Sequence, residues 1–325
     1  MAMPVGYGHN VPIIPNFPFL WSASGFTYLG ISVVQNINSL LRRNFYSVRK
    51  DIKNDLNRWM DLPITWMGRI NLIKMNVLPR LLYVMQMLPL YISKKAAREV
   101  ERDLSKFIWQ RKKPRLSMKT LQLPRDSGGL AFPNIILYNW ACHGRFIYDW
   151  AHCYLKGIED PLESWACVPF RLLGELTCKK TALPKVRDNP ILQSSIRIWH
   201  DMHRFVGRKG AFSYLTPLMG NRDLLPGIEN DVFRSWQKRG VRVVGDLFDD
   251  NNVLMSFPQA QNRFGLPQKD FFAYLQVRHF INTNLKSTQT EILKGPIDKF
   301  IINLTLNNGL ITYFYNSLQC CNQQC

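Results

Sequence analysis

Two adjacent acidic residues, Asp249 and Asp250, are the first candidates for chemistry in this sequence. Paired aspartates at a hairpin tip can hold two divalent ions in a nucleic-acid polymerase, one activating the attacking oxygen and one stabilising the leaving oxygen. In that motif one residue separates an aromatic residue from the pair, whereas Phe248 directly precedes Asp249, and Asn251 and Asn252 favour a turn. We therefore interpret the pair as an acidic turn, and we predict no catalytic residue, metal or cofactor in this chain.

Cysteine and histidine residues suggest zinc, because thiolate and imidazole are its usual ligands. They gather at Cys142, His143, His152 and Cys153. If this segment is helical, positions 142 and 153 are roughly 16 Å apart at 1.5 Å per residue, too far to share one ion. Two further groups lack the remaining ligands of a metal site, namely His200 with His203, and Cys320 with Cys321 and Cys325. Seven scattered cysteines suggest no secreted disulfide framework, so we expect reduced thiols.

Positive charge is the strongest feature of the composition. The net charge is +19 over 325 residues, and residues 39–125 hold 20 Lys or Arg against 6 Asp or Glu, a net of +14. A charge of this size favours polyanionic partners and carries no information about fold. No acidic residue precedes Asp51, so the first fifty residues cannot supply a carboxylate to a metal site.

The basic segment reads as three helices. Apolar residues recur at three and four positions from Ser39, a second helix runs from Thr65 with a kink expected at Pro79, and Ser93 can cap a third. The cations on and after these helices are candidate phosphate contacts: Arg42, Arg43, Arg49, Lys50, Lys53, Arg58, Arg69, Lys74, Arg80, Arg111, Lys112, Lys113 and Arg115. Such a series of cations is often only the solvent-exposed face of a helix, without a binding role. Interspersed aromatic residues favour nucleic-acid binding, although they can equally be core: Tyr46, Trp59, Trp66 and Trp109.

The remaining chain predicts a second, mostly helical unit. Residues 126–134 suggest a turn, a short strand and a helix initiated by Pro133, followed by a helix through Trp140 and Trp150. Short helices and breaks follow Pro161, and residues 270–281 form another helical pattern. We divide the chain into an irregular or β segment (1–38), a basic helical bundle (39–125), a helical region (126–302) and a weakly ordered tail (303–325). No apolar run is long enough to span a membrane, and no signal peptide is evident, so we expect an intracellular protein.

Five blocks of sequence resemble the downstream half of reverse transcriptases from non-LTR retrotransposons of the LINE type. They appear in the family's order with similar gaps: FTYLGI, RRNFYSVRKDIKNDLNRW, PITWMGRINLIKMNVLPRLLYVMQMLP, KFIWQRKKPR and GGLAFPNIILYNWA. The later GDLF and LPQKDFFAYLQVRHF segments are similar to the region that follows in vertebrate members. The resemblance covers most of the chain.

The resemblance implies a fold and a site. Tyr28, Leu29 and Gly30 match the primer grip, a hairpin that braces the end of the growing strand, and the three basic helices match the thumb, which clamps the template and primer duplex. The expected fold is mainly α, with a short β-hairpin leading into a thumb-like bundle and then a second helical unit. The family's metal-binding aspartates lie in a palm that precedes the primer grip, and we expect this chain to start after them.

The functional expectation is a polymerase fragment without its catalytic palm, which binds template and primer duplex through phosphates regardless of sequence. Two alternatives remain open. One is a helical interaction module whose basic face meets acidic protein or lipid, and the other is a decayed transposon copy without a retained function. Protein partners are not predicted.

Overall fold

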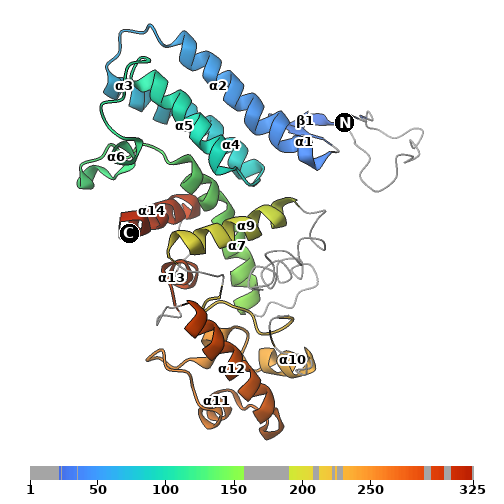
Figure 1. Ribbon diagram of the computed structural model, residues 1–325. Coiled ribbons are helices and arrows are strands. Elements are labelled where there is room, and N and C mark those ends of the chain that lie inside the picture. Colours follow the sequence, from blue (N-terminus) through green and yellow to red (C-terminus); the bar gives the residue numbers. More distant parts are fainter. Residues whose placement is uncertain are drawn as a thin grey trace. The chain divides into compact units, whose positions relative to one another are not determined.

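The computed structural model describes residues 22, 24–34, 36–156, 190–207, 212–221, 224, 230–288, 294–303 and 309–323 (Figure 1). The described residues are mainly helical, and a two-stranded hairpin precedes the helices as predicted. The chain divides into two compact units, Met1–Asn139 and Trp140–Cys325, which are called unit 1 and unit 2 below. The expectations for residues 1–20 and 161–189 lie outside the described residues.

The hairpin consists of β1 (Phe26–Tyr28) and β2 (Ile31–Val33), paired antiparallel with Tyr28 opposite Ile31. Leu29 and Gly30 form its two-residue turn, with φ angles of 46° and 77°. A positive φ at both turn positions matches the right-handed twist of the strands, which is why two-residue hairpin loops favour it. Glycine adopts this conformation without steric cost, whereas Leu29 does not.

The first predicted helix is continuous but contains a π-helical turn. It comprises α1 (Ile37–Leu41), the π turn η1 (Arg42–Tyr46) and α2 (Ser47–Arg58). The side chain of Asn44 in η1 bonds both backbone groups of Ser32, accepting from its N–H at 2.8 Å and donating to its carbonyl at 2.9 Å. These two hydrogen bonds, made from the π turn η1, therefore attach β2 to the first helix.

The second predicted helix also runs without interruption, through α3 (Trp66–Leu72), η2 (Ile73–Val77) and α4 (Leu78–Met87). Thr65 caps it by accepting from the Gly68 N–H at 3.2 Å. Proline has no N–H and cannot bond the carbonyl four residues earlier. Here Pro79 lies in the first turn of α4, directly after a π-helical turn in which the N–H of Leu78 bonds the Ile73 carbonyl.

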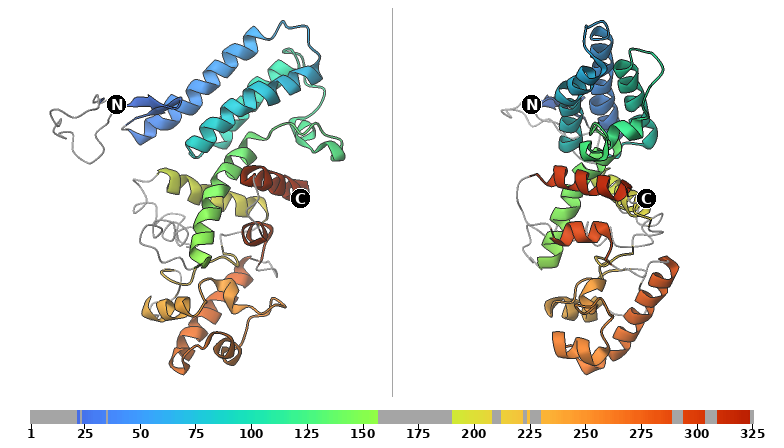
Figure 2. Two further views of the ribbon diagram at one scale, coloured as in Figure 1. Left: turned by 180° about the vertical axis from the view of Figure 1, so that it is seen from behind. Right: turned by 90° about the vertical axis from the view of Figure 1, so that its left-hand side faces the viewer.

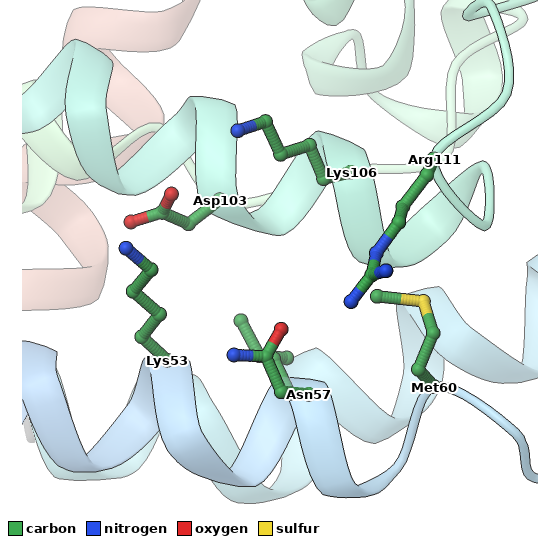
Figure 3. Close-up of a pocket in the computed structure, with 7 residues that line it drawn as sticks. Lys53, Asn57, Met60, Asp103, Lys106 and Arg111 are labelled. Carbon is green, nitrogen blue, oxygen red and sulfur yellow. The ribbon is translucent and has the colours of Figure 1, made fainter.

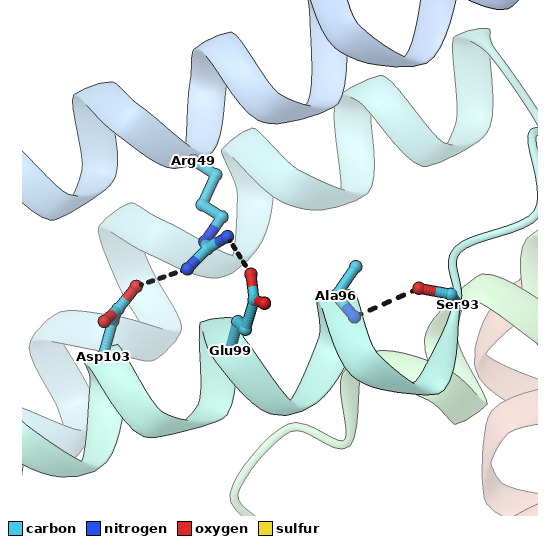
Figure 4. Close-up of polar contacts among 5 residues, drawn as sticks. All are labelled: Arg49, Ser93, Ala96, Glu99 and Asp103. Carbon is cyan, nitrogen blue, oxygen red and sulfur yellow. Dashed lines mark hydrogen bonds and ion pairs between the residues drawn. The ribbon is translucent and has the colours of Figure 1, made fainter.

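The third predicted helix is confirmed as α5 (Lys94–Ile108), and Ser93 caps it by accepting from the Ala96 N–H at 3.2 Å (Figure 4). Its predicted apolar face is buried throughout: Ala97, Val100, Leu104, Phe107 and Ile108. Helix α2 packs against both α4 and α5 (Figure 2). A loop then leads to the short helix α6 (Met118–Gln122).

Residues 126–134 differ in part from the prediction. The turn is present as η3 (Arg125–Ser127) followed by Gly128 at φ 77°, but no strand forms in this described segment. The N–H groups of Leu130 and Phe132 both bond the Leu121 carbonyl instead. Helix α7 (Ile135–Lys156) starts after Asn134, whose side chain accepts from two N–H groups of the first turn, so asparagine rather than Pro133 initiates it.

The second unit is mostly helical in its described residues. Its helices are α9 (Pro190–Phe205), α10 (Asn230–Lys238), α11 (Phe257–Phe264), α12 (Phe271–Thr288), α13 (Pro296–Asn303) and α14 (Leu310–Gln323), with short 3₁₀ turns η5 (Val244–Leu247) and η6 (Gln268–Asp270). Trp236 is fully buried in a core of this unit and donates to Asp270 at 2.9 Å. The predicted helix over 270–281 is confirmed within α12.

The chain end forms helix α14 over 310–323, where the sequence predicted a weakly ordered tail from 303 onward. Its buried side chains recur at helical spacing, at Phe314, Tyr315, Leu318 and Cys321. The Phe314 ring lies against Gly144 of α7, so close that a Cβ atom there would be 2.9 Å from the ring. The polar residues between the apolar positions obscured this pattern in the sequence. Within the described part of the chain, no helix combines the length and the apolar character needed to cross a membrane.

Candidate nucleic-acid interface

The hairpin tip is exposed and fastened to the second helix. Tyr28 and Leu29 are 64% and 70% exposed. The hydroxyl of Tyr83 in α4 donates to the Leu29 carbonyl and so attaches the hairpin turn to the second helix. With Asn44 holding β2, the tip presents two large apolar side chains to solvent from a fixed base.

A groove between α2 and α5 brings cations together. This α2–α5 groove has a volume of about 370 Å³ and is lined by Lys53, Leu56, Asn57, Met60, Asp103, Lys106 and Arg111. Lys53 projects from α2, Lys106 from α5, and Arg111 from the loop that follows α5 (Figure 3). The lining holds three cations and one carboxylate, and this excess of positive charge makes the groove electrostatically suited to an anion such as a phosphate group.

The one carboxylate of the groove already has a partner. Arg49 bridges α2 and α5 by bonding Glu99 at 2.5 Å and Asp103 at 3.1 Å (Figure 4). Burial alone would lower the pKa of Arg49, but its hydrogen bonds to the two carboxylates and their charges outweigh this and raise the pKa. Asp103 is thus oriented by Arg49, and Arg49 itself is committed to joining the two helices.

Arg58 and Arg80 share a second carboxylate. Both bond Asp55, at 3.0 and 2.7 Å respectively. Arg58 is 73% exposed and Arg80 is 37% exposed. Exposed pairs of this kind contribute little to stability, and a phosphate can compete for either guanidinium. Either arginine can therefore contact a phosphate only if its ion pair with Asp55 breaks.

The structure corrects one predicted contact, Arg69. Its side chain is fully buried, donates to the carbonyls of Met60, Leu62 and Phe107 at 2.8, 3.0 and 3.3 Å, and lies 4.8 Å from the Phe107 ring centroid. Burial lowers the pKa of Arg69, and the charge of Asp61 partly opposes this. A guanidinium enclosed in this way cannot reach a phosphate. The sequence hid this because an arginine on a helix normally faces solvent.

Lys74 is also engaged within the unit. Its ammonium group donates to the Leu130 carbonyl, which ties η2 to the segment before α7. Burial lowers the pKa of Lys74, and the charge of Arg125 lowers it further. The structure therefore gives Lys74 a role in the fold.

Eight predicted contacts remain exposed on unit 1, and none of them forms an ion pair with the residues that the structure describes. They are Arg42, Arg43, Lys50 and Lys53 on the first helix, and Arg111, Lys112, Lys113 and Arg115 after α5. The α2–α5 groove joins the two sets, because Lys53 and Arg111 both line it. The fold therefore brings one cation of each set to the same groove.

Five exposed cations on α5 were absent from the prediction: Lys94, Lys95, Arg98, Arg102 and Lys106. Arg98, Arg102 and Lys106 follow one another at four-residue spacing, opposite the buried face of α5. This four-residue spacing is visible in the sequence and could have identified these cations as one exposed helix face. Lys106 completes the α2–α5 groove.

The interspersed aromatic residues are mostly structural. Trp66 stacks on Trp109 with centroids 5.5 Å apart and planes 17° apart, and Trp109 is only 7% exposed. Trp59 is half-buried. Tyr46 is 38% exposed, with its ring edge against Phe45. Phosphate contacts rather than base stacking are thus the chemistry that this surface offers.

The Asp249 and Asp250 segment forms a turn. The Asp249 carboxylate accepts from the N–H groups of Asn251 and Val253 at 3.0 and 2.8 Å, and Asn252 adopts a φ of 59°. Asp250 points toward Arg263 at 3.9 Å and is 99% exposed. The geometry is that of an aspartate stabilising its own turn.

The cysteine and histidine candidates lie mainly inside unit 2. Cys142 and His143 are buried, and burial raises the pKa of the Cys142 thiol to about 12. His143 bonds Ser195 at 3.0 Å, and His152 stacks on Tyr148. Both His200 and His203 are buried, and so is Cys321, whereas Cys320 is exposed. Cys325 lies outside the described residues. Among the residues that the structure describes, no three His, Cys, Asp or Glu side chains are grouped to hold a metal.

No protein-family model matches this chain.

Proposed function

We propose that this chain is the thumb-containing part of a LINE-type reverse transcriptase and binds template and primer duplex through its phosphates, without regard to sequence. The observation that supports this most is the α2–α5 groove, which Lys53, Lys106 and Arg111 line while Arg49 engages the neighbouring carboxylate of Asp103. Phosphate contacts of this kind position a protein on nucleic acid but carry no base information.

The exposed cations suit a duplex backbone better than a single anion. Arg42, Arg43 and Lys50 continue along the first helix from the groove, and the loop with Lys112 and Lys113 extends from its other side. Successive phosphates along a strand can contact such a series. The hairpin tip adds apolar contact near the strand end, in the role that the family resemblance gives it.

Salt dependence tests the proposal directly. If about five of the exposed cations engage phosphates at once, the logarithm of the binding constant should fall with the logarithm of salt concentration with a slope of about −4 to −5. The measurement is a fluorescence anisotropy titration of a labelled RNA–DNA hybrid at several salt concentrations. A slope near zero would contradict the proposal.

Charge reversal locates the contact. In the triple variant Lys53→Glu, Lys106→Glu and Arg111→Glu, we expect binding to the hybrid to weaken by about 100-fold or more, because three attractive contacts become repulsive. A matched control reverses three exposed cations of unit 2, at Lys269, Arg278 and Lys299, with the same change in net charge. Equal losses in both variants would indicate a nonspecific charge effect and would remove the groove from the site.

The proposal assigns no polymerisation to this chain. Mixing it with Mg²⁺, primer, template and nucleotides should give no extension. Extension that is lost in the double variant Asp249→Asn and Asp250→Asn would overturn this part of the proposal.

A further inference from the structure

A second groove on unit 1 combines cations with an apolar lining. This α5–α6 groove has a volume of about 470 Å³. It is formed by one side of α5, the loop over 111–117 and α6. Its volume lies within the range of about 300–1,000 Å³ that is typical of ligand sites.

The cations of the α5–α6 groove come from two elements. Arg98, Arg102 and Lys106 line it from α5, and Arg111 and Lys112 line it from the loop. None of these five forms an ion pair with a carboxylate among the described residues. The one acidic residue of the lining is Glu101, and burial raises its pKa although its bond to Gln122 acts in the opposite direction. The groove therefore carries an excess of positive charge.

The apolar part of the groove is aliphatic. Pro114, Leu116, Met118 and Leu121 line it, and Leu116 is 40% exposed. Nucleic acids gain little from an aliphatic lining, because their phosphates pair with cations and their unpaired bases stack on aromatic rings. Leucine and the flexible methionine side chain instead accommodate the apolar side chains of a peptide. This composition favours a protein partner over a nucleic acid.

The walls of the groove are fixed before any ligand arrives. The Gln122 amide donates to Glu101 at 3.0 Å and so holds α6 against α5. Ser117 caps α6 by accepting from the Thr120 N–H at 3.0 Å. The N–H of Arg111 bonds the Lys106 carbonyl at 2.8 Å and closes the end of α5. A preformed groove lowers the ordering cost of binding.

We propose that the α5–α6 groove docks a short acidic amphipathic peptide segment of another protein. Its apolar side chains would contact Leu116 and Met118, and its carboxylates would pair with Arg98, Arg102 and Lys112. A guanidinium can bond both oxygens of a carboxylate, which suits arginine to this recognition. The proposal depends on charge complementarity and on the aliphatic lining, and it does not require nucleic-acid binding, although the proposed nucleic-acid surface also includes Lys106, Arg111 and Lys112.

The test is a direct binding measurement with the full chain. The probe is a fluorescein-labelled synthetic peptide of about 15 residues, long enough for four helical turns. It carries Leu or Phe at helical spacing on one face and Asp or Glu elsewhere. A scrambled peptide of the same composition keeps the charge but loses the apolar face. We expect the scrambled peptide to bind about tenfold more weakly, because only the patterned one can place its apolar side chains together.

Variants assign the peptide to the groove. Arg98→Glu with Arg102→Glu should weaken peptide binding at least about tenfold, because two attractive contacts become repulsive. Leu116→Ser changes an exposed side chain and should weaken it about threefold or more without unfolding the protein. The matched control, Arg42→Glu with Arg43→Glu, makes the same charge change elsewhere on unit 1 and should leave peptide binding unchanged.

Three results would overturn the proposal. Equal binding of the patterned and scrambled peptides would show attraction by charge alone. Unchanged affinity in both groove variants would place the peptide elsewhere. If Leu116→Ser weakens binding of an RNA–DNA hybrid while peptide binding stays the same, the occupant of the groove is nucleic acid.

Discussion

Replacing Arg69 with alanine tests whether this buried cation of unit 1 supports the fold or contacts nucleic acid. The guanidinium joins the turn before α3 to the end of α5, through the carbonyls of Met60, Leu62 and Phe107. Its carbon chain packs inside the unit, with the charged group over the Phe107 ring. Alanine removes both the three hydrogen bonds and this packing.

The expected loss of stability can be estimated from these contacts. Three hydrogen bonds at about 1 kcal/mol net each give about 3 kcal/mol. The cavity left by the missing methylene groups adds about 1–2 kcal/mol. Arg69→Ala should therefore lower the free energy of unfolding of unit 1 by about 4–5 kcal/mol, which is a large fraction of the stability of an ordinary domain.

Two further variants separate the contributions. Arg69→Met keeps most of the packing and loses the bonds, so its cost should be about 3 kcal/mol. Arg58→Ala removes an exposed cation from the same unit, and its cost should be below about 1 kcal/mol. Urea unfolding followed by circular dichroism gives these values, and hydrogen exchange over residues 60–72 and 105–111 localises them.

One combination of results would show that Arg69 contacts nucleic acid. In that combination, Arg69→Ala keeps the stability of the wild type, and the slope of the logarithm of the hybrid binding constant against the logarithm of salt concentration becomes shallower by about 0.9, the value for one phosphate contact. Arg69 would then lie at the interface, and its buried arrangement would be wrong.

Three predictions concern unit 2. Because burial raises the pKa of the Asp246 carboxyl despite two backbone N–H bonds, the folded state holds its proton more tightly than the unfolded state. The free energy of unfolding should fall as pH rises from about 4 through the raised pKa, and urea titrations should show no such fall in Asp246→Asn. With its pKa near 12, Cys142 should resist iodoacetamide at neutral pH while exposed Cys320 reacts; mass spectrometry showing equal labelling would refute this. Gly144→Val should destabilise unit 2 by about 1–3 kcal/mol, because its side chain overlaps the Phe314 ring; an unchanged melting temperature would argue against the docking of α14.

Features encoded within a few residues were predictable from the sequence. Thr65 and Ser93 precede apolar periodic runs, and both cap helices where the sequence placed them. The apolar spacing of α5 identified its buried face because the pattern and the contact are local to one helix. The hairpin at Leu29 and Gly30 was expected from the family resemblance, which covers the local FTYLGI block.

Features that depend on distant partners were not predictable. Arg69 and Lys53 look alike in the sequence, yet the partners of Arg69 include a carbonyl 38 residues away, at Phe107. The π turn at Asn44 depends on Ser32, and the order of α14 depends on Gly144. A single sequence without its tertiary contacts contains no signal that distinguishes these residues from solvated ones.

Arginine and lysine have different roles among the described cations of unit 1, because only arginines form its ion pairs. Every ion pair among its described residues uses an arginine, at Arg49, Arg58 and Arg80, and none uses a lysine. Arginine suits this role because its planar group can bond several acceptors at once. The pairs engage three of the six carboxylates within residues 39–125, at Asp55, Glu99 and Asp103. Carboxylates that might have neutralised Lys53 or Lys106 are thereby occupied, so the same pairs that hold the helices together leave the grooves positive.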